Sequence, residues 1–414
     1  MEDLLLSVII IIVVLDFIWE QILNFLNRTK MSPDIPAELM GIYDNEQYAR
    51  QQAYQKTNSR LDLISGSFLF IIILGMLIFH GFGYLDGLLR QITENFILLP
   101  LLYLGIITLV LQIISFPFEW YDTFVIEERY GFNRSSKSLF IIDFFKKLLL
   151  TFVMGGVILA IILYIYKYTE EWFWIFAWII ISLFSVFMSI LYSKWIVPLF
   201  NKQRKLHSGE LRQKIETFAW NAGFEMQDIY ILDGSKRSTK ANAYFTGLGK
   251  KKRIVLFDTL IKELEPDEVL AVLAHEIGHY RKKHIQQSLV MSIISTGVIL
   301  FILSLLLNNP MLSKALGSDI PSFHLGLVGF SFLFSPISGL IGLLFNHISR
   351  KNEYEADAFV KKYNLKDALI RGLIKSSIRS LSNLTPHPWM VFCHYSHPTL
   401  LQRIHKLKNR QENC

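Results

Sequence analysis

Two histidines four residues apart, in the segment HEIGH at residues 275–279, are the part of the sequence best suited to chemistry. Pro266, with acidic residues on both sides of it, predicts the start of a helix that runs through this segment. Residues i and i+4 lie on one helical face, so the imidazoles of His275 and His279 can bind one Zn²⁺. Glu276 can reach a water molecule at the metal and take its proton. The pattern predicts a zinc-dependent hydrolase, and the alternative is a helix with two ordinary hydrogen-bonded histidines.

A third protein ligand is needed, because a catalytic zinc usually has three and keeps one position for water. His284 is the nearest candidate, but a continuous helix, at about 100° per residue, would turn it away from His275. A longer motif with a third histidine at position 285 is also excluded, since that residue is isoleucine. We therefore expect the third ligand to come from a distant part of the chain.

Glu353, in the acidic segment NEYEAD at 352–357, is the stronger candidate. The helix of the two histidines leads into one long apolar stretch, and Glu353 follows the next stretch, which returns to the same side. At about 1.5 Å per residue, all three groups then lie at a similar height on antiparallel helices. Asp357, one turn further along, could orient a ligand histidine. Glu355 points to another side of this helix, and the alternative for the whole segment is an acidic surface helix.

Seven long apolar stretches must position these residues. A helix crosses a bilayer core with about 20 apolar residues, because no water is present there to satisfy open backbone groups. The composition agrees, with 52% hydrophobic and 19% charged residues, and it excludes a disordered chain. The first stretch has no basic leader and no small-residue cleavage site, so we expect a retained membrane helix. The stretches are 4–27, 63–84, 96–116, 148–166, 172–200, 288–308 and 324–345.

Positive charge marks the side of the membrane that holds the polar parts of the chain. The segments 28–60, 117–147, 201–287 and 346–414 carry 38 of the 42 Lys and Arg residues. Cytoplasmic loops are enriched in these residues, so the bias places the four segments in the cytosol and the N-terminus outside. Topology thus explains the net charge of +7. Because no stacking aromatic residues are interleaved with the basic ones, we expect no nucleic-acid partner.

These features predict an α-helical polytopic membrane protein with a small α+β zincin-like catalytic lobe on the cytosolic side. Within the lobe we expect a helix at 211–222 and strands at 228–232, 243–245 and 253–257. The expected regions are five membrane helices in 1–200 with cytosolic loops 28–60 and 117–147, the catalytic segment 201–287 with the HEIGH helix, two membrane helices in 288–345, and a cytosolic helical tail with Glu353 in 346–414.

The sequence resembles the CAAX prenyl endopeptidases, which are seven-span membrane zinc metalloproteases of the gluzincin type, found in the endoplasmic reticulum and with bacterial homologues. The resemblance covers nearly the whole chain and follows the order of the family's motifs. The matching segments are FVIEERYGFNRSS at 124–136, NAYF at 242–245 with RIVLFDTL at 253–260, HEIGH at 275–279, EYEAD at 353–357 and YSHP at 395–398.

The resemblance implies seven helices that enclose a water-filled chamber, with one zinc ion at its cytosolic end. Substrates would be proteins or peptides in the bilayer that are cut close to a prenylated C-terminal cysteine. By the same resemblance, His275, His279 and Glu353 would bind the zinc, and Glu276 would activate the water.

Substrate contacts are also implied by the resemblance. Asn242, with Ala243 and Tyr244, would lie on an edge strand that holds the substrate backbone by β-augmentation. His397 would stabilise the oxyanion of the tetrahedral intermediate, with Arg403 nearby, since a hydrogen-bond donor is needed where negative charge develops. On the residues alone, His397 belongs to a His-Pro turn in a histidine-rich tail.

The chain also departs from the family pattern. It is shorter than the eukaryotic members and carries no retrieval signal for the endoplasmic reticulum. These departures favour a bacterial inner-membrane homologue over one of the endoplasmic reticulum, and they leave open whether the substrate carries a prenyl group.

Three other functions are weighed against this one. A membrane quality-control protease of the bacterial heat-shock type shares the HExxH motif and the later glutamate, but it is shorter and has fewer spans. A site-2 type protease would need an acidic ligand within 288–308 or 324–345, which contain none. A transporter with a structural metal would need charges or broken helices near the membrane midplane, where Asp16 is the only good candidate.

Overall fold

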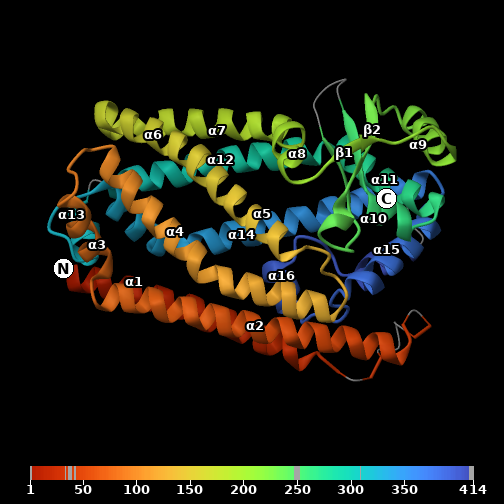
Figure 1. Cartoon of the computed structure of the whole chain (residues 1–414), viewed down its shortest axis with the longest axis horizontal. Coiled ribbons are helices and arrows are strands. Elements are labelled where there is room, and N and C mark those ends of the chain that lie inside the picture. The colour runs from red at the N-terminus through yellow and green to blue at the C-terminus, as the bar shows by residue number, and fades with distance from the viewer. Residues whose placement is uncertain are drawn as a thin grey trace.

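The computed structural model describes residues 2–32, 34–35, 40–41, 43–246, 252–307 and 309–409. Among these residues, seven helical segments are long and apolar enough to cross a membrane, one for each apolar stretch of the sequence. Figure 1 shows them running side by side, with the N-terminus at one end and the α+β lobe at the other. The segments are α1 (Glu2–Thr29), α2 (Asn45–Ile78), α4 (Leu98–Tyr121) with the π-helical η2 (Asp122–Glu127), α5 (Lys137–Leu150) with η3 (Thr151–Gly155) and α6 (Gly156–Thr169), α7 (Phe173–Leu191) with η5 (Tyr192–Ile196) and α8 (Val197–Phe200), α12 (His284–Leu307) and α14 (Phe323–Lys362).

Two of these helices reach further towards the lobe than the apolar stretches predict. Helix α2 begins at Asn45, where the Asp44 side chain accepts a hydrogen bond from the Gln47 amide, so the predicted loop 28–60 is largely helical. Helix α5 begins after the capping residue Ser136 in the same way. Hydropathy marks only the part of a helix that lies in lipid, and the caps mark where the helix begins.

At the opposite end of the bundle, the second apolar stretch is not one helix. Helix α2 ends at Ile78, and His80 has a left-handed φ of 52° that turns the chain into the short helix α3 (Gly81–Arg90). The predicted stretch 63–84 was therefore wrong beyond residue 78. Helix α13 (Pro310–Ala315) lies beside α3 at this end (Figure 1).

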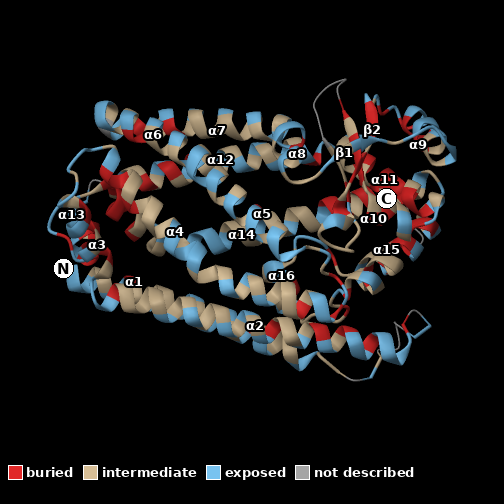
Figure 2. Cartoon of the chain, in the orientation of Figure 1, coloured by how far each residue is buried: buried red, intermediate tan, exposed pale blue. Residues whose placement is uncertain are grey.

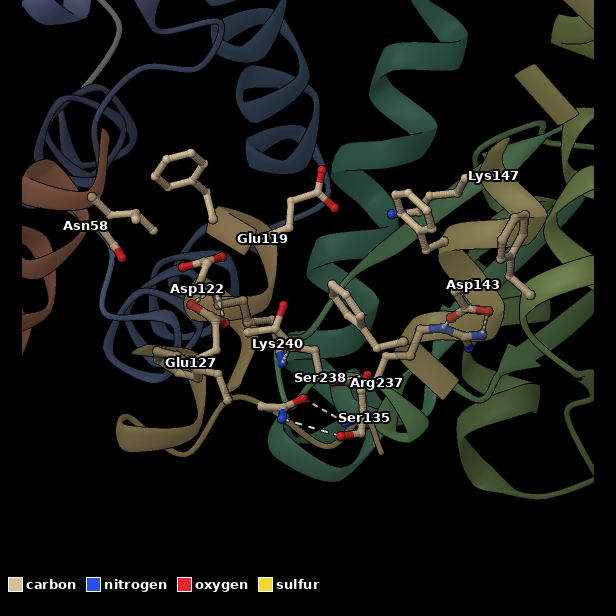
Figure 3. Close-up of a pocket in the computed structure, with 18 of the residues that line it drawn as sticks. Asn58, Glu119, Asp122, Glu127, Ser135, Asp143, Lys147, Arg237, Ser238 and Lys240 are labelled. Atoms are coloured by element: carbon tan, nitrogen blue, oxygen red, sulfur yellow. Dashed lines mark hydrogen bonds and ion pairs between the residues drawn. The ribbon is translucent and has the colours of Figure 1, made fainter. Parts of the chain in front are cut away.

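Burial is uneven along the bundle. Figure 2 shows buried residues around α3 and α13 and in the lobe, while the central turns of the long helices are mostly half-buried or exposed. Helix faces that do not pack on protein face lipid or an internal space. A cavity of about 1000 Å³ lies between the helices and the lobe. Its polar wall includes Asn58, Glu119, Asp122 and Lys147 (Figure 3).

Two ion pairs in this wall fasten the lobe to the membrane helices. Arg237 in the lobe donates two hydrogen bonds, of 2.7 and 3.0 Å, to the carboxylate of Asp143 on α5 (Figure 3). Lys240 contacts Glu127 of η2 at 3.0 Å. Bidentate Arg–carboxylate pairs fix geometry as well as charge. The backbone that leads into the predicted substrate strand is therefore held against two membrane segments.

The lobe is built on a small mixed sheet with strand order β1-β2-β4-β3 among the described residues. The central pair is parallel, and the two outer pairs are antiparallel. Strands 228–232 and 253–257 lie where the sequence predicts them, whereas β1 is short and polar and carries no such signal. The strands are β1 (Gln203–Lys205), β2 (Asp228–Leu232), β3 (Ala243–Thr246) and β4 (Arg253–Phe257). The other short elements are α9 (Glu210–Asn221), η4 (Glu170–Trp172), η6 (Gly234–Lys236), α10 (Asp258–Glu263), α15 (Lys366–Ser380), α16 (Pro388–His394) and α17 (Leu400–Lys408).

Helix α11 (Pro266–Arg281) carries the HEIGH segment and packs against the lobe end of α14. It begins with a capping box in which the side chains of Glu265 and Glu268 each accept a hydrogen bond from the other residue's backbone amide. Gly278 faces α14, and a Cβ atom there would lie 3.1 Å from the Cα of Ala356 and 3.1 Å from the Cβ of Phe359. The missing side chain allows the two helices to approach closely.

The substitution Gly278→Ala tests this contact. Alanine raises helix propensity by about 1 kcal/mol, but overpacking against fixed backbone costs about 1–3 kcal/mol. We expect the thermal unfolding midpoint to fall or stay unchanged and zinc affinity to fall, because the two helices separate. Gly339→Ala on α14 is the matched control, since its Cβ would meet nothing within 4 Å. Wild-type zinc affinity in Gly278→Ala, measured by chelator competition, would contradict the close-packing argument.

Candidate zinc site

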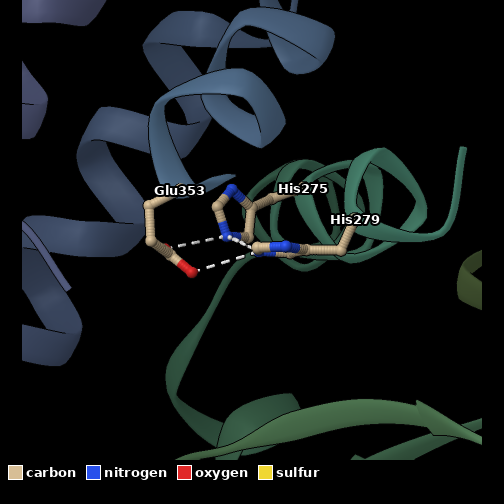
Figure 4. A group of neighbouring side chains, drawn as sticks. All are labelled: His275, His279 and Glu353. Carbon is tan, nitrogen blue, oxygen red and sulfur yellow. Dashed lines mark hydrogen bonds and ion pairs between the residues drawn. The ribbon is translucent and has the colours of Figure 1, made fainter. Parts of the chain in front are cut away.

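Helices α11 and α14 bring His275, His279 and Glu353 together, although Glu353 lies far from the histidines in the sequence (Figure 4). The two Nε2 atoms are 3.1 Å apart. Oε2 of Glu353 lies 3.3 Å from Nε2 of His275, and Oε1 of Glu353 lies 3.2 Å from Nε2 of His279. Ligands at 2.0–2.1 Å from a tetrahedral zinc are separated by about 3.3 Å. The three groups therefore lie close enough together to bind one zinc ion.

The surroundings of these atoms also suit a cation. Glu353 is buried, and its Oε2 accepts no hydrogen bond from the described residues. A buried carboxylate costs free energy unless positive charge lies next to it, and the nearest fixed cation is Arg403, whose Nη1 is 3.5 Å from this oxygen. Among the described residues, no other group of His, Cys, Asp and Glu side chains has this arrangement.

Asp357 lies against His275, where its position one turn beyond Glu353 leads us to expect it. Its Oδ1 is 2.9 Å from Nδ1 of His275, and Arg403 donates two hydrogen bonds, of 2.6 and 3.0 Å, to the same carboxylate. A hydrogen on Nδ1 leaves Nε2 free to bind a metal. Burial and the charge of Arg403 lower the pKa of His275, but hydrogen bonds to Asp357 and Glu353 outweigh both and raise that pKa to about 9.

Glu276 lies in the same pocket as the three groups. Its carboxylate makes no hydrogen bond or ion pair with the described residues, unlike those of Glu353 and Asp357. Burial raises the pKa of the Glu276 carboxyl, which the positive charge of the neighbouring histidines opposes. The arrangement leaves one carboxylate free to exchange a proton with a molecule in the pocket.

The pocket, of about 530 Å³, is bounded on one side by the edge strand β3. Ala243 and Tyr244 lie on this strand, and Asn242 immediately precedes it. The Asn242 carbonyl accepts a hydrogen bond from the Phe257 amide at 3.0 Å, so the pairing with β4 extends to this residue. Because β3 pairs only with β4 among the residues that the structure describes, its other side can receive an extended peptide.

His397 and Arg403 come from the C-terminal segment and differ in accessibility. The side chain of His397 is 64% exposed, and its Nε2 lies 3.3 Å from Oε1 of Glu353. The side chain of Arg403 is only 12% exposed, and its nitrogens contact Asp357, His275 and Glu353. His397 therefore lies at the open side of the group, and Arg403 lies behind it.

His284 lies where the argument from a continuous helix did not place it. Helix α11 ends at Arg281, Lys283 has a left-handed φ of 61°, and α12 begins at His284. The turn brings Nδ1 of His284 to 3.0 Å from Nδ1 of His279. The prediction that His284 faces away was wrong, because it assumed a continuous helix. No glycine or proline in the sequence marks the turn that ends α11. His284 still stays outside the ligand group, since it meets the other side of the His279 ring.

The seven membrane segments and the buried His, His and Glu group next to Glu276 define an integral membrane zinc metalloendopeptidase. A family model described as the CAAX prenyl protease N-terminal region with five membrane helices matches residues 24–202, and the model of peptidase family M48 matches residues 205–411. The chain therefore belongs to the CAAX prenyl protease group of peptidase family M48. The match over five N-terminal membrane helices favours this function over the shorter heat-shock type.

Individual relatives agree over most of the chain. The CAAX prenyl protease 1 homolog of Mus musculus is 32% identical over 446 residues, covering 96% of this chain and 94% of that protein. CAAX prenyl protease 1 of Saccharomyces cerevisiae is 37% identical over 323 residues, covering 73% and 71%. The crystal structure of S. mikatae Ste24p superposes with a TM-score of 0.93 at 30% identity, covering 98% of this chain and 99% of that one. The predicted family, fold class and zinc peptidase activity are confirmed.

The pKa of His275 predicts how zinc binding depends on pH. In the metal-free protein the imidazole is protonated below about pH 9, and zinc must displace that proton. We expect the apparent zinc affinity to rise about tenfold per pH unit between pH 6 and 8, with about one proton released per zinc. Chelator competition and calorimetry in buffers of different ionisation enthalpy measure both quantities. An affinity independent of pH over this range would contradict the assignment.

Proposed function

We propose that this protein cuts a peptide bond near the C-terminus of prenylated proteins, with His275, His279 and Glu353 as zinc ligands and Glu276 as general base. The observation that carries the ligand assignment is the convergence of the three side chains: the two Nε2 atoms are 3.1 Å apart, and each lies within 3.3 Å of an oxygen of the Glu353 carboxylate. The names of the relatives supply the substrate class.

The chain's own groups divide the hydrolysis between them. Zinc, when bound, would polarise the scissile carbonyl and make water a better nucleophile. Glu276, which has no other partner in the described structure, takes the proton of the attacking water and then gives it to the leaving amine. His397 has an accessible Nε2 on the open side of the site and donates a hydrogen bond to the oxyanion.

The substrate backbone is bound by the free side of β3. An extended peptide that pairs with Ala243 and Tyr244 runs past the zinc ligands, because the strand and the ligands line one pocket. Arg403 acts through Asp357 and His275, which it contacts from behind, so we assign it to positioning the ligands. The residues that touch the substrate are then those of β3 and His397.

The lobe and the zinc site lie on the cytosolic side in this proposal. The described segments that carry most Lys and Arg residues gather at the lobe end of the bundle, and the N-terminus lies at the other end (Figure 1). A prenyl group would stay in the bilayer next to this end. The expectation of a bacterial inner membrane stays a prediction, since the relatives from mouse and yeast are eukaryotic.

Replacing Glu276 by glutamine tests the general base. We expect kcat to fall by about 10²–10⁴-fold, while the protein keeps one zinc per chain, because glutamine preserves the shape and removes the proton acceptor. The assay follows cleavage of a farnesylated CAAX peptide by purified protein in detergent. Glu225→Gln, an exposed glutamate on the lobe, is the control. A Glu276→Gln variant that cleaves at the wild-type rate would rule out the assignment.

The same peptide without its farnesyl group separates the two enzyme functions. Selective cleavage of the farnesylated peptide supports CAAX processing. Equal cleavage of both peptides supports a quality-control protease, a function that the polar wall of the large cavity also suits.

Glu353→Ala tests the third ligand. Removing the only carboxylate in the group leaves two histidines, so we expect zinc affinity to fall by at least about 100-fold. Lys362→Ala, at the exposed end of the same helix, controls for changes in α14. Metal content is measured by atomic emission after dialysis against a weak chelator. Wild-type zinc content in Glu353→Ala would place the third ligand elsewhere.

A further inference from the structure

The two histidine ligands of the proposed site have different partners on their outer nitrogens. Nδ1 of His275 meets the carboxylate of Asp357 at 2.9 Å. Nδ1 of His279 instead meets Nδ1 of His284 at 3.0 Å. The proposed hydrolysis uses Asp357 and leaves His284 without a role, although His284 is buried and lines the catalytic pocket.

Binding of zinc by Nε2 of His279 would fix which nitrogen carries each hydrogen. Nε2 of His279 faces Glu353 and His275, so it must be unprotonated to bind a metal there. The hydrogen of neutral His279 then lies on Nδ1 and points at His284. Nδ1 of His284 must accept this hydrogen bond, and the hydrogen of His284 therefore lies on its Nε2.

Glu355 completes the arrangement on the far side of His284. Its Oε2 lies 3.5 Å from Nε2 of His284, the nitrogen that carries the hydrogen. Glu355 comes from α14, which also supplies Glu353 and Asp357. Helix α14 thus contributes the proposed ligand Glu353 and two further carboxylates. Asp357 contacts His275 directly, and Glu355 faces His279 through His284.

The backbone conformation of Lys283 produces the contact between His284 and His279. Lys283 has a φ of 61°, a conformation that non-glycine residues rarely adopt and that costs free energy. The turn that Lys283 makes reverses the chain and brings His284 onto the ring of His279. Nδ1 and Nε2 lie on opposite sides of that ring, so His284 cannot reach an ion held by Nε2.

We propose that His284 is a positioning residue: it accepts the Nδ1 hydrogen of His279, holds this ligand in the tautomer that binds zinc, and is itself oriented by Glu355. The inference rests on the proposed function, since it assigns a role towards the zinc of that site. It adds to the site the hydrogen bond between His279 and His284, with Glu355 beyond it at 3.5 Å from Nε2 of His284.

The test uses two substitutions of His284 that differ in one property. The Oδ1 atom of asparagine occupies nearly the position of Nδ1 and can accept the same hydrogen bond, whereas leucine cannot. We expect His284→Leu to lower zinc affinity by about 10–100-fold and His284→Asn to keep it within about threefold of wild type. Zinc affinity is measured by chelator competition on the full-length protein in detergent, and the unfolding midpoint of the metal-free protein reports folding.

Further variants make the outcome specific. His207→Leu, at an exposed position of the lobe, is the matched control and should bind zinc normally. Glu355→Gln should weaken zinc binding in the wild type and have no further effect in His284→Leu, because it acts through His284. Equal losses in His284→Leu and His284→Asn, or wild-type affinity in His284→Leu, would overturn the proposal. Wild-type protein that binds no zinc would instead overturn the proposed function.

Discussion

The contact between α11 and α14 is the interaction on which the site depends. Neither helix holds the complete set of proposed zinc ligands, and Gly278 lets the helices approach so that the Glu353 carboxylate lies within 3.3 Å of both histidines. Packing at this density transmits small displacements, so a shift of a few tenths of an ångström at Gly278 would move Glu353 relative to both histidines. The lobe core beneath α11 and the membrane part of α14 both stabilise the contact between these two helices.

The membrane imposes the second constraint. Within a bilayer the backbone must satisfy its own hydrogen bonds, which favours uninterrupted helices. Helix α14 continues without a break from the membrane to Lys362, so the segment that carries Glu353 inherits the rigidity of a membrane span. The lobe is tied to the other spans by the pairs Arg237–Asp143 and Lys240–Glu127. Strand β3 and the proposed zinc ligands, which line one pocket, are therefore positioned by different membrane helices.

Charge balance is the third element of the design. The buried site contains the carboxylates of Glu353 and Asp357 with Arg403 as the main fixed cation. Buried charges without partners are costly, and a bound zinc ion would add positive charge next to these carboxylates in place of the proton on His275. The outer partners of the histidines then decide which ring nitrogen is free. Asp357 does this for His275 directly. Because Asp357 and Glu353 both lie on α14, the choice of ring nitrogen and the position of the carboxylate depend on the same contact between α11 and α14.

The sequence by itself determined the elements and the chemistry. Long apolar runs predicted all seven spans, because the bilayer requires them, and the i, i+4 spacing of His275 and His279 predicted a metal on one helical face. Equal distances of α11 and Glu353 from the membrane also predicted that Glu353 lies beside the two histidines, since helical rise is constant. The positions of residues that depend on turns and on side-chain contacts were determined only by the tertiary structure. The left-handed Lys283 moved His284 from the far side of a helix onto His279, and the burial of Arg403 behind Asp357 gave it contacts with the ligands. Such contacts arise from packing between distant segments, and local sequence patterns carry no signal for them.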